Sequence, residues 1–216
     1  MTSRIMDWVD ERLNLRPLLK EIADHPVPAH VNFWHCFGGI TFAIIMLQIA
    51  TGIFLTMYYV PAPDHAYASV EYISNEVRFG RLIRGMHRIG SSAAVITVVI
   101  HMMRVYFQGA YKKPRELNWI AGVGLLLVVF GFGFTGYLLP WDQKAYWATV
   151  VGTNIAGAVP VIGPFILKVM RGGTDLGAVT LTRFFSTHIW ILPGALITLL
   201  VGHFFMIRRQ GVAGPF

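Results

Sequence analysis

The sequence predicts an all-α membrane protein, a bundle of four membrane-spanning helices preceded by an amphipathic helix on the membrane surface. Two observations predict this class. Of the 216 residues, 55% are hydrophobic and only 13% are charged, which is about half the charged fraction of a soluble domain. The apolar residues also gather in four stretches long enough to cross a hydrocarbon layer of about 30 Å. Because lipid offers the backbone no hydrogen-bonding partners, we expect each stretch to be a helix.

The elements follow in order along the chain, and we expect them to form one domain over residues 1–216. Residues 3–20 place apolar side chains at helical spacing among charged ones, which is typical of a helix lying on a membrane surface. Pro26 and Pro28 end this helix. The four spanning helices are then expected at residues 33–59, 85–107, 117–139 and 184–207.

Four spans place both chain termini on the same side of the membrane, together with the loop at residues 109–116. Basic residues are in slight excess on that side, which indicates the cytoplasmic or stromal face. The longer loops at residues 60–83 and 140–183 lie on the opposite side. Because the second loop has apolar stretches too short to span, we expect short surface helices that cover a lipophilic pocket. The chain is thus expected to be a multi-pass integral membrane protein.

Charge and cysteine content exclude several classes of function. A net charge of +7 would favour nucleic-acid binding in a soluble protein, but here the basic residues cluster at the ends of apolar segments, which fits membrane topology. We therefore expect no nucleic-acid partner. The single cysteine excludes an internal disulfide and every CxxC metal site. The segment GFGFTG at residues 131–136 matches a dinucleotide-binding pattern, but it lies inside an apolar span rather than at a strand-to-helix turn.

Two pairs of histidines lie inside the spans, His87 and His101 in the second, and His188 and His203 in the fourth. On an α-helix, 14 residues rise ~21 Å and end ~40° short of the starting direction, and 15 residues rise ~22 Å and end ~60° past it. Both members of a pair therefore face roughly the same way, at two depths. If the two helices are antiparallel, depth pairs His87 with His188 and His101 with His203.

Such an arrangement of imidazoles predicts a haem-binding bundle. Ionisable groups inside a membrane are costly and usually functional. Haem iron accepts two neutral imidazoles as axial ligands, and facing helices of a bundle are where such sites are built. Two stacked haems would carry electrons across a membrane. The alternative is that these histidines are packed polar residues, each bonded to a neighbour.

Four glycines repeat the same interval, Gly38 and Gly52 in the first span and Gly122 and Gly136 in the third. Bare backbone at the depth of each histidine would let a porphyrin edge approach closely. The alternative is that these glycines are helix-contact points, which are common in membrane helices.

Two arginines accompany the histidines of the second span, Arg84 three residues before His87 and Arg104 three residues after His101. Arginine is well shaped to bind carboxylates, so we expect each arginine to bind the propionates of one haem. The alternative is that both are interfacial charges whose stems lie along the apolar surface.

Together these features resemble the cytochrome b family in its split b6-type form, the N-terminal subunit of b6f or menaquinol:cytochrome c reductase complexes. The resemblance covers essentially the whole chain. The 15-residue interval of the fourth span and the end near residue 216 are similar to the split form. The motifs that carry it are, in order, FGGI, LQIATG, LIRGMHR, KKPRELNW, GFTGYLLPWDQ, LTRFFSTH and HFFMIRRQGVAGPF.

The resemblance implies a cytochrome b N-terminal-type domain with two haems b. It implies a low-potential haem b ligated by His87 and His188 on the positive side. It implies a high-potential haem b ligated by His101 and His203 on the negative side.

The resemblance also assigns residues outside these pairs. Cys36 matches the cysteine that holds a third haem, a haem c, by a single thioether bond, whereas the plain alternative is a buried free cysteine. His35 beside it is expected to be an interfacial residue. Arg208 and Glu21 match positions near the negative-side quinone pocket, although Glu21 stands where the family often has aspartate.

The function that the resemblance implies is one subunit of a quinol-oxidising, proton-translocating oxidoreductase. One electron from the quinol would pass to a Rieske iron–sulfur protein. The second would pass through the two haems to a quinone on the negative side. The chain lacks the PEWY-type motif for quinol deprotonation, so we expect that motif on a smaller, subunit IV-like membrane subunit and no activity from this chain alone. A c-type cytochrome subunit, membrane lipid and a dimeric complex are also implied.

Several alternatives stay open at this point. The complex could be respiratory or photosynthetic, in a bacterial plasma membrane or a thylakoid membrane, and its quinol could be menaquinol or plastoquinol. A cytochrome b membrane anchor of another quinone-linked dehydrogenase would explain the histidines but not the matching glycines or the PWD loop. A transporter or scaffold would need no stack of imidazoles.

Overall fold

The computed structural model describes residues 2–24 and 28–213, leaving out the side chains of residues 2, 3, 18 and 21–23. Over these residues the secondary structure is helical, without a strand. Contacts divide the chain into a first unit within residues 1–31 and a second unit within residues 32–216. The predicted all-α class is confirmed.

The first unit contains two helices, α1 (Thr2–Leu13) and α2 (Leu15–Ala23), where the sequence predicted one helix over residues 3–20. The prediction was wrong because it ignored Pro17, whose ring and missing N–H oppose a continuous helix. Asn14 adopts the left-handed conformation with φ 48°. Asparagine is one of the few residue types that tolerate this conformation. The break leaves Pro17 in the first turn of α2, where no backbone donor is needed.

The second unit contains the four spans. In its described part, four helical segments are long and apolar enough to cross a membrane, as predicted. The second begins at Gly80 rather than residue 85, and the fourth at Ala178 rather than residue 184. The spans are η1 with α3 (Phe33–Cys36, Phe37–Thr56), α5 (Gly80–Phe107), α6 (Glu116–Leu138), and α9, η2 and α10 (Ala178–Ser186, Thr187–Ile191, Leu192–Gln210).

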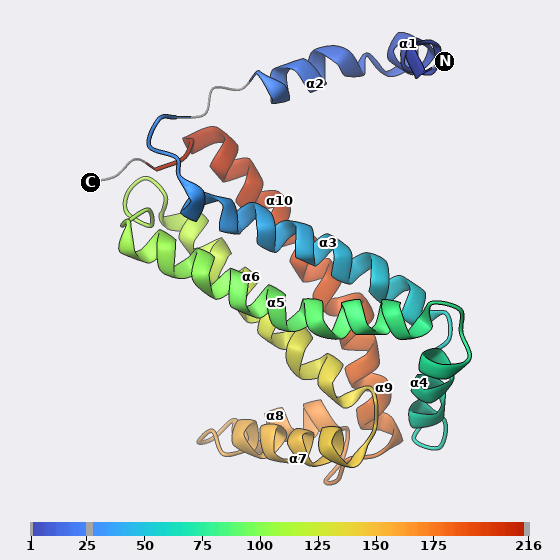
Figure 1. The fold of residues 1–216 in the computed structure, drawn as a ribbon. Helices are drawn as coiled ribbons and strands as arrows, with labels where there is room; N and C mark the ends of the chain where they lie inside the picture. The colour runs from blue at the N-terminus through green and yellow to red at the C-terminus, as the bar shows by residue number, and fades with distance from the viewer. Residues whose placement is uncertain (1, 25–27, 214–216) are drawn as a thin grey trace. The chain divides into compact units, whose positions relative to one another are not determined.

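The spans run side by side as a bundle in which α3 packs mainly against α5, and α6 packs mainly against α10 (Figure 1). Most apolar side chains on their outer faces are exposed, for example Ile53, Leu127 and Val201. Exposed apolar surface of this extent is expected of a lipid-facing protein.

Shorter helices gather at one end of the bundle: α4 (Ala66–Asn75), α7 (Gln143–Gly157) and α8 (Gly163–Arg171) (Figure 1). The sequence predicted short helices in the second loop, and α7 and α8 confirm this, whereas α4 was not predicted. The Asp142 carboxylate begins α7 by accepting a hydrogen bond from the Ala145 N–H at 2.7 Å.

Arg171 joins these short helices from a buried position. Its guanidinium donates to Thr153 Oγ1 and Asn154 Oδ1, both at 2.8 Å, and to the carbonyls of Val150 and Thr174. The side chain is only 7% exposed. Its donors are therefore used to tie α8 to α7 and to the segment that follows.

Tyr59 connects the end of the first span to the segment after the third. Its hydroxyl donates to the Leu139 carbonyl at 2.7 Å. Burial raises the pKa of the Tyr59 phenol, so the phenol stays protonated and remains a donor.

The core of the bundle is a layer of buried aliphatic side chains contributed by all four spans. Its buried members are Ile45, Val98, Leu125, Val129 and Leu196. Ile45 stands seven residues from both Gly38 and Gly52, and Val129 stands seven residues from both Gly122 and Gly136. The core therefore lies midway between the two depths at which the sequence places the histidines.

Candidate functional site

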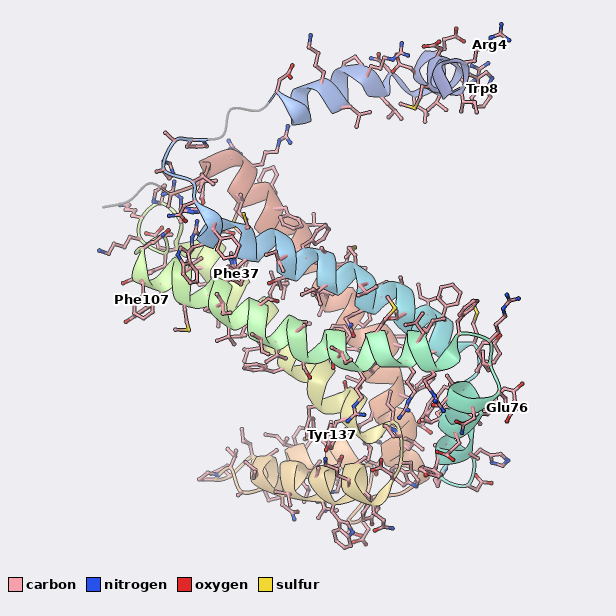
Figure 2. All side chains as sticks on the ribbon, viewed as in Figure 1. Arg4, Trp8, Phe37, Glu76, Phe107 and Tyr137 are labelled. Atoms are coloured by element: carbon pink, nitrogen blue, oxygen red, sulfur yellow. The ribbon has the colours of Figure 1, made fainter. Side chains whose placement is uncertain are left out.

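The histidines form two layers along the bundle. The first histidine layer is His87 on α5 with His188 on η2, and the second histidine layer is His101 on α5 with His203 on α10. Figure 2 shows Phe37 and Phe107 at the end nearer the second layer, and Glu76 and Tyr137 at the opposite end. The ring centroids of His87 and His188 are 6.5 Å apart, and Gly38 and Gly122 lie against the rings of His101 and His203. These are the pairs that helix direction and depth predicted.

A π-helical turn at His188 explains the 15-residue interval of the fourth span. Residues Thr187–Ile191 form this turn, and the Leu192 N–H donates to the Thr187 carbonyl, five residues back rather than four. Pro193 follows, and its missing N–H and bulky ring disturb the α-helical pattern just before it. A π turn accommodates one extra residue. The 15 residues therefore keep His188 and His203 in nearly the same relative direction as 14 residues of regular helix.

Each histidine of the first layer is held by a threonine. The Nδ1 atom of His87 lies 2.9 Å from Thr51 Oγ1, and the Nδ1 atom of His188 lies 2.9 Å from Thr135 Oγ1. Thr51 is on α3 and Thr135 is on α6, so each contact crosses between two packed spans.

Each of the four singled-out glycines faces one histidine ring. A Cβ built on Gly136 would lie 2.8 Å from His188 Cε1, and one on Gly38 would lie 3.0 Å from His101 Cε1. The corresponding distances are 3.3 Å from Gly52 to His87 and 3.6 Å from Gly122 to His203. The glycines therefore allow the imidazole rings themselves to lie against the neighbouring helix. This contact explains the repeat of the glycines more specifically than room for a porphyrin edge does.

The geometry of the first layer fits one metal ion between two imidazoles. A metal–imidazole nitrogen bond is about 2.0–2.1 Å, so two such bonds plus the two ring radii come to about the observed 6.5 Å. The rings are too far apart for a direct hydrogen bond. Among the described residues no group of three or more His, Cys, Asp or Glu side chains could hold a bare metal ion. An ion held here must bring its remaining ligands with it, as haem iron does.

Several buried polar atoms near the second layer have no hydrogen-bonding partner among the described residues. They come from α5, from the start of α6 and from the end of α10: His101 Nδ1, Arg104 Nε, Arg115 Nε, Asn118 Oδ1, His203 Nδ1 and Gln210 Oε1. Buried polar groups without partners are rare in native proteins. Their gathering at one end of the bundle indicates a place where a polar ligand group completes the structure.

Comparison with known proteins decides the family. The family model described as Cytochrome b/b6/petB matches residues 22–211. This chain belongs to the cytochrome b/b6 family. It is therefore a haem protein of membrane electron transport, and the predicted resemblance is confirmed.

Cytochrome b/b6 relatives match this chain along its whole length. The menaquinol:cytochrome c reductase cytochrome b subunit of Geobacillus thermodenitrificans is 54% identical, with both chains fully covered. Cytochrome b6 of Heliobacterium modesticaldum is 49% identical over 97% of this chain and all of the relative. A chain of a hyperthermophilic respiratory complex III has 33% identity and a TM-score of 0.90, covering 97% of this chain and 56% of that one.

Three further residues expected from the cytochrome b/b6 resemblance, Cys36, His35 and Arg208, belong to the second unit. Cys36 ends η1, two residues before Gly38, and its thiol is exposed rather than buried. His35 belongs to a capping box, in which the Asn32 N–H donates to His35 Nδ1 at 3.1 Å. Arg208 lines an open apolar pocket with Phe204, Phe205 and Arg209. The side chain of Glu21 lies outside the described residues.

The two expected propionate ligands differ in environment. Arg84 donates to Ser74 Oγ on α4 at 3.1 Å, whereas Arg104 keeps a buried Nε–H without a partner among the described residues. Arg115 resembles Arg104 in this respect, but its position in the sequence did not indicate a propionate ligand.

Thr51 and Thr135 were missed because a threonine in a membrane helix usually bonds only to its own helix. A signal was nevertheless present in the sequence. Each threonine directly precedes one of the singled-out glycines, as the dipeptide TG.

Proposed function

We propose that this chain is the two-haem subunit of a menaquinol:cytochrome c reductase, carrying electrons between the two faces of the membrane. The observation that carries the proposal is the stack of two imidazole pairs on the same four helices. Menaquinol is favoured because relatives named for it, in Geobacillus thermodenitrificans and Bacillus subtilis, are 54% and 53% identical over the full chain. The same names favour a respiratory complex in a bacterial plasma membrane.

Each of the two histidine layers would hold one haem b. His87 and His188 would hold the haem of the first layer, and His101 and His203 would hold that of the second. Two haems bound in this way supply one-electron carriers at two depths of the membrane. The buried aliphatic core between the layers excludes water. Electrons on the carriers are thereby kept from side reactions with solvent.

Arginines at the two ends would bind the haem propionates. Arg84 stands at the first layer. Arg104 and Arg115 stand at the second, where their unused Nε–H groups favour carboxylate binding. We place the low-potential haem in the first layer on the positive side, and the high-potential haem in the second layer on the negative side, with both chain termini. The excess of basic residues near the termini supports this orientation.

Cys36 would hold a haem c through one thioether bond. An exposed thiol at the start of the first span, near the second layer, supports this role. We further propose that Arg208 and Glu21 border the negative-side quinone pocket. For Arg208, support comes from the apolar pocket that it lines.

The activity belongs to a complex rather than to this chain alone. We propose a smaller membrane subunit, a Rieske iron–sulfur protein and a c-type cytochrome as partners in a dimeric complex, and coupling of quinol oxidation to proton translocation. We also propose that both units of the chain, residues 1–31 and 32–216, act as one functional domain.

Spectroscopy of the purified complex tests this proposal. A pyridine haemochrome assay is expected to find two haems b for each copy of this chain. A menaquinol analogue is expected to reduce them, and the complex is expected to reduce a c-type cytochrome. A complex with two haems b but no Rieske cluster and no cytochrome c reduction would favour the membrane anchor of another dehydrogenase. A colourless complex would contradict both functions.

A further inference from the structure

The two histidine layers differ in how their Nδ1 atoms are bound. In the first layer each Nδ1 lies 2.9 Å from a threonine hydroxyl, that of Thr51 or Thr135. In the second layer the Nδ1 atoms of His101 and His203 are buried without a hydrogen-bonding partner among the described residues. The backbone of Asn118 lies near the His203 ring but does not meet the geometry of a hydrogen bond with Nδ1.

The difference comes from the residue that precedes each glycine. Thr51 and Thr135 precede Gly52 and Gly136, the glycines that face the first layer. At the same register of the second layer, the residues before Gly38 and Gly122 are Phe37 and Ala121, which have no hydroxyl. The asymmetry is thus built into two positions of α3 and two positions of α6.

The threonines also determine which ring nitrogen carries the proton. Thr51 Oγ1 donates to the Leu47 carbonyl and Thr135 Oγ1 donates to the Gly131 carbonyl, both at 2.7 Å. A hydroxyl has one proton to donate. Each Oγ1 must therefore accept from the histidine, so the proton is on Nδ1 and the lone pair is on Nε2. That tautomer is the one in which imidazole binds a metal through Nε2.

A hydrogen bond from the distal N–H raises the basicity of a metal-bound imidazole. A more basic ligand donates more electron density to iron and stabilises the ferric form relative to the ferrous form. Among the described residues, no acceptor makes a hydrogen bond with either Nδ1 atom of the second layer, so its histidines are expected to be poorer electron donors.

We propose that Thr51 and Thr135 are positioning residues that lower the reduction potential of the haem held by the first layer. Their absence from the second layer is one source of the potential difference that directs electrons from the first layer to the second. This inference rests on the proposed function, because it requires a haem in each layer.

Redox titration of the haems in the whole complex tests the inference. Thr51→Val and Thr135→Val keep the side-chain shape and remove the hydroxyl. The net value of a hydrogen bond is about 0.5–1.5 kcal/mol. Only the difference in hydrogen-bond strength between the ferric and ferrous forms affects the midpoint. We therefore expect each variant to shift the ferric/ferrous equilibrium of the low-potential haem toward ferrous by up to about tenfold, where tenfold corresponds to about 59 mV for one electron. The high-potential haem is expected to keep its midpoint.

Matched variants separate the proposed effect from a general disturbance. Thr41 lies on the same helix as Thr51 and is equally buried, but its hydroxyl bonds only to the Phe37 carbonyl. Thr41→Val is therefore expected to move neither midpoint. Thr51→Ser and Thr135→Ser keep a hydroxyl and are expected to keep the midpoint of the unaltered complex.

The converse variant adds a hydroxyl to the second layer. Ala121→Thr places a threonine directly before Gly122, the glycine that faces His203. This variant is expected to lower the midpoint of the high-potential haem. If the valine variants lose a haem, the Ala121→Thr variant provides the test. An unmoved midpoint of its high-potential haem overturns the inference. Unmoved midpoints in valine variants that keep both haems overturn it as well. An unaltered complex without two haems b would instead overturn the proposed function.

Discussion

The imidazole rings of His87 and His188 lie with their centroids 6.5 Å apart and their planes at 66°, although 101 positions separate them in the sequence. Neither ring is placed by its own helix alone. Thr51 and Gly52 of α3 fix the His87 ring, and Thr135 and Gly136 of α6 fix the His188 ring. Each ring is thus positioned by a neighbouring span, as a preorganised metal site would require.

Replacement of Gly136 by alanine is expected to remove the haem of the first layer. The new Cβ would lie 2.8 Å from His188 Cε1 and 3.3 Å from its Nδ1, so the ring must leave the position in which it is paired with His87. The haem b content, measured by the pyridine haemochrome assay, is expected to fall by half. Gly133→Ala on the same helix is the control, because a Cβ there meets nothing within 4 Å. Equal haem content in both variants would show that the glycine does not limit the ring.

Replacement of Cys36 by serine is expected to abolish covalently bound haem and leave both haems b. The exposed thiol at the end of η1 is close in sequence to Gly38 but makes no contribution to the histidine pairs. Haem staining of a denaturing gel measures the covalent haem, and the haemochrome assay measures the rest. Absence of stain at this polypeptide in the unaltered complex would refute the thioether assignment.

Replacement of Arg171 by methionine is expected to destabilise the short-helix end without removing haem. The change leaves the acceptors on Thr153, Asn154, Val150 and Thr174 without their donor, and the cost is about 3 kcal/mol. Thermal unfolding of the complex measures the change in Tm. Arg78→Met, at an exposed arginine, is expected to leave Tm nearly unchanged. A similar Tm for both variants would mean that the buried guanidinium does not hold α7 and α8 together.

The sequence predicted the four spans and the pairing of the histidines because hydropathy and helical spacing act on long segments. It did not predict the break at Asn14, which depends on a single proline three residues later. It did not predict the early start of the fourth span at Ala178. Arg183 and the threonines of α9 lower the hydropathy of this segment, which made a loop the expected structure. Such details are decided by local backbone geometry, which hydropathy averages away.

The contacts around the histidine rings were less predictable than the histidines themselves. Hydropathy and helical spacing did not distinguish Thr51 and Thr135 from Thr41 or Thr97, since each bonds to its own helix. The TG dipeptide was the signal in the sequence, and contact between spans shows that these two threonines meet a ring. The π turn at Thr187–Ile191 was likewise hidden in an interval of 15, although Pro193 gave a reason to expect an irregular turn.

Haem stoichiometry after replacement of His188 by alanine measures whether this histidine holds the haem of the first layer. The variant removes one proposed ligand of that layer and leaves His101 and His203 untouched. We expect the low-potential haem b signal to disappear and the high-potential signal to stay at full amplitude, whereas His65→Ala, which changes an exposed histidine outside the spans, is expected to keep both signals. Survival of both haem b signals in the His188→Ala complex would show that the two histidine pairs do not each hold a haem.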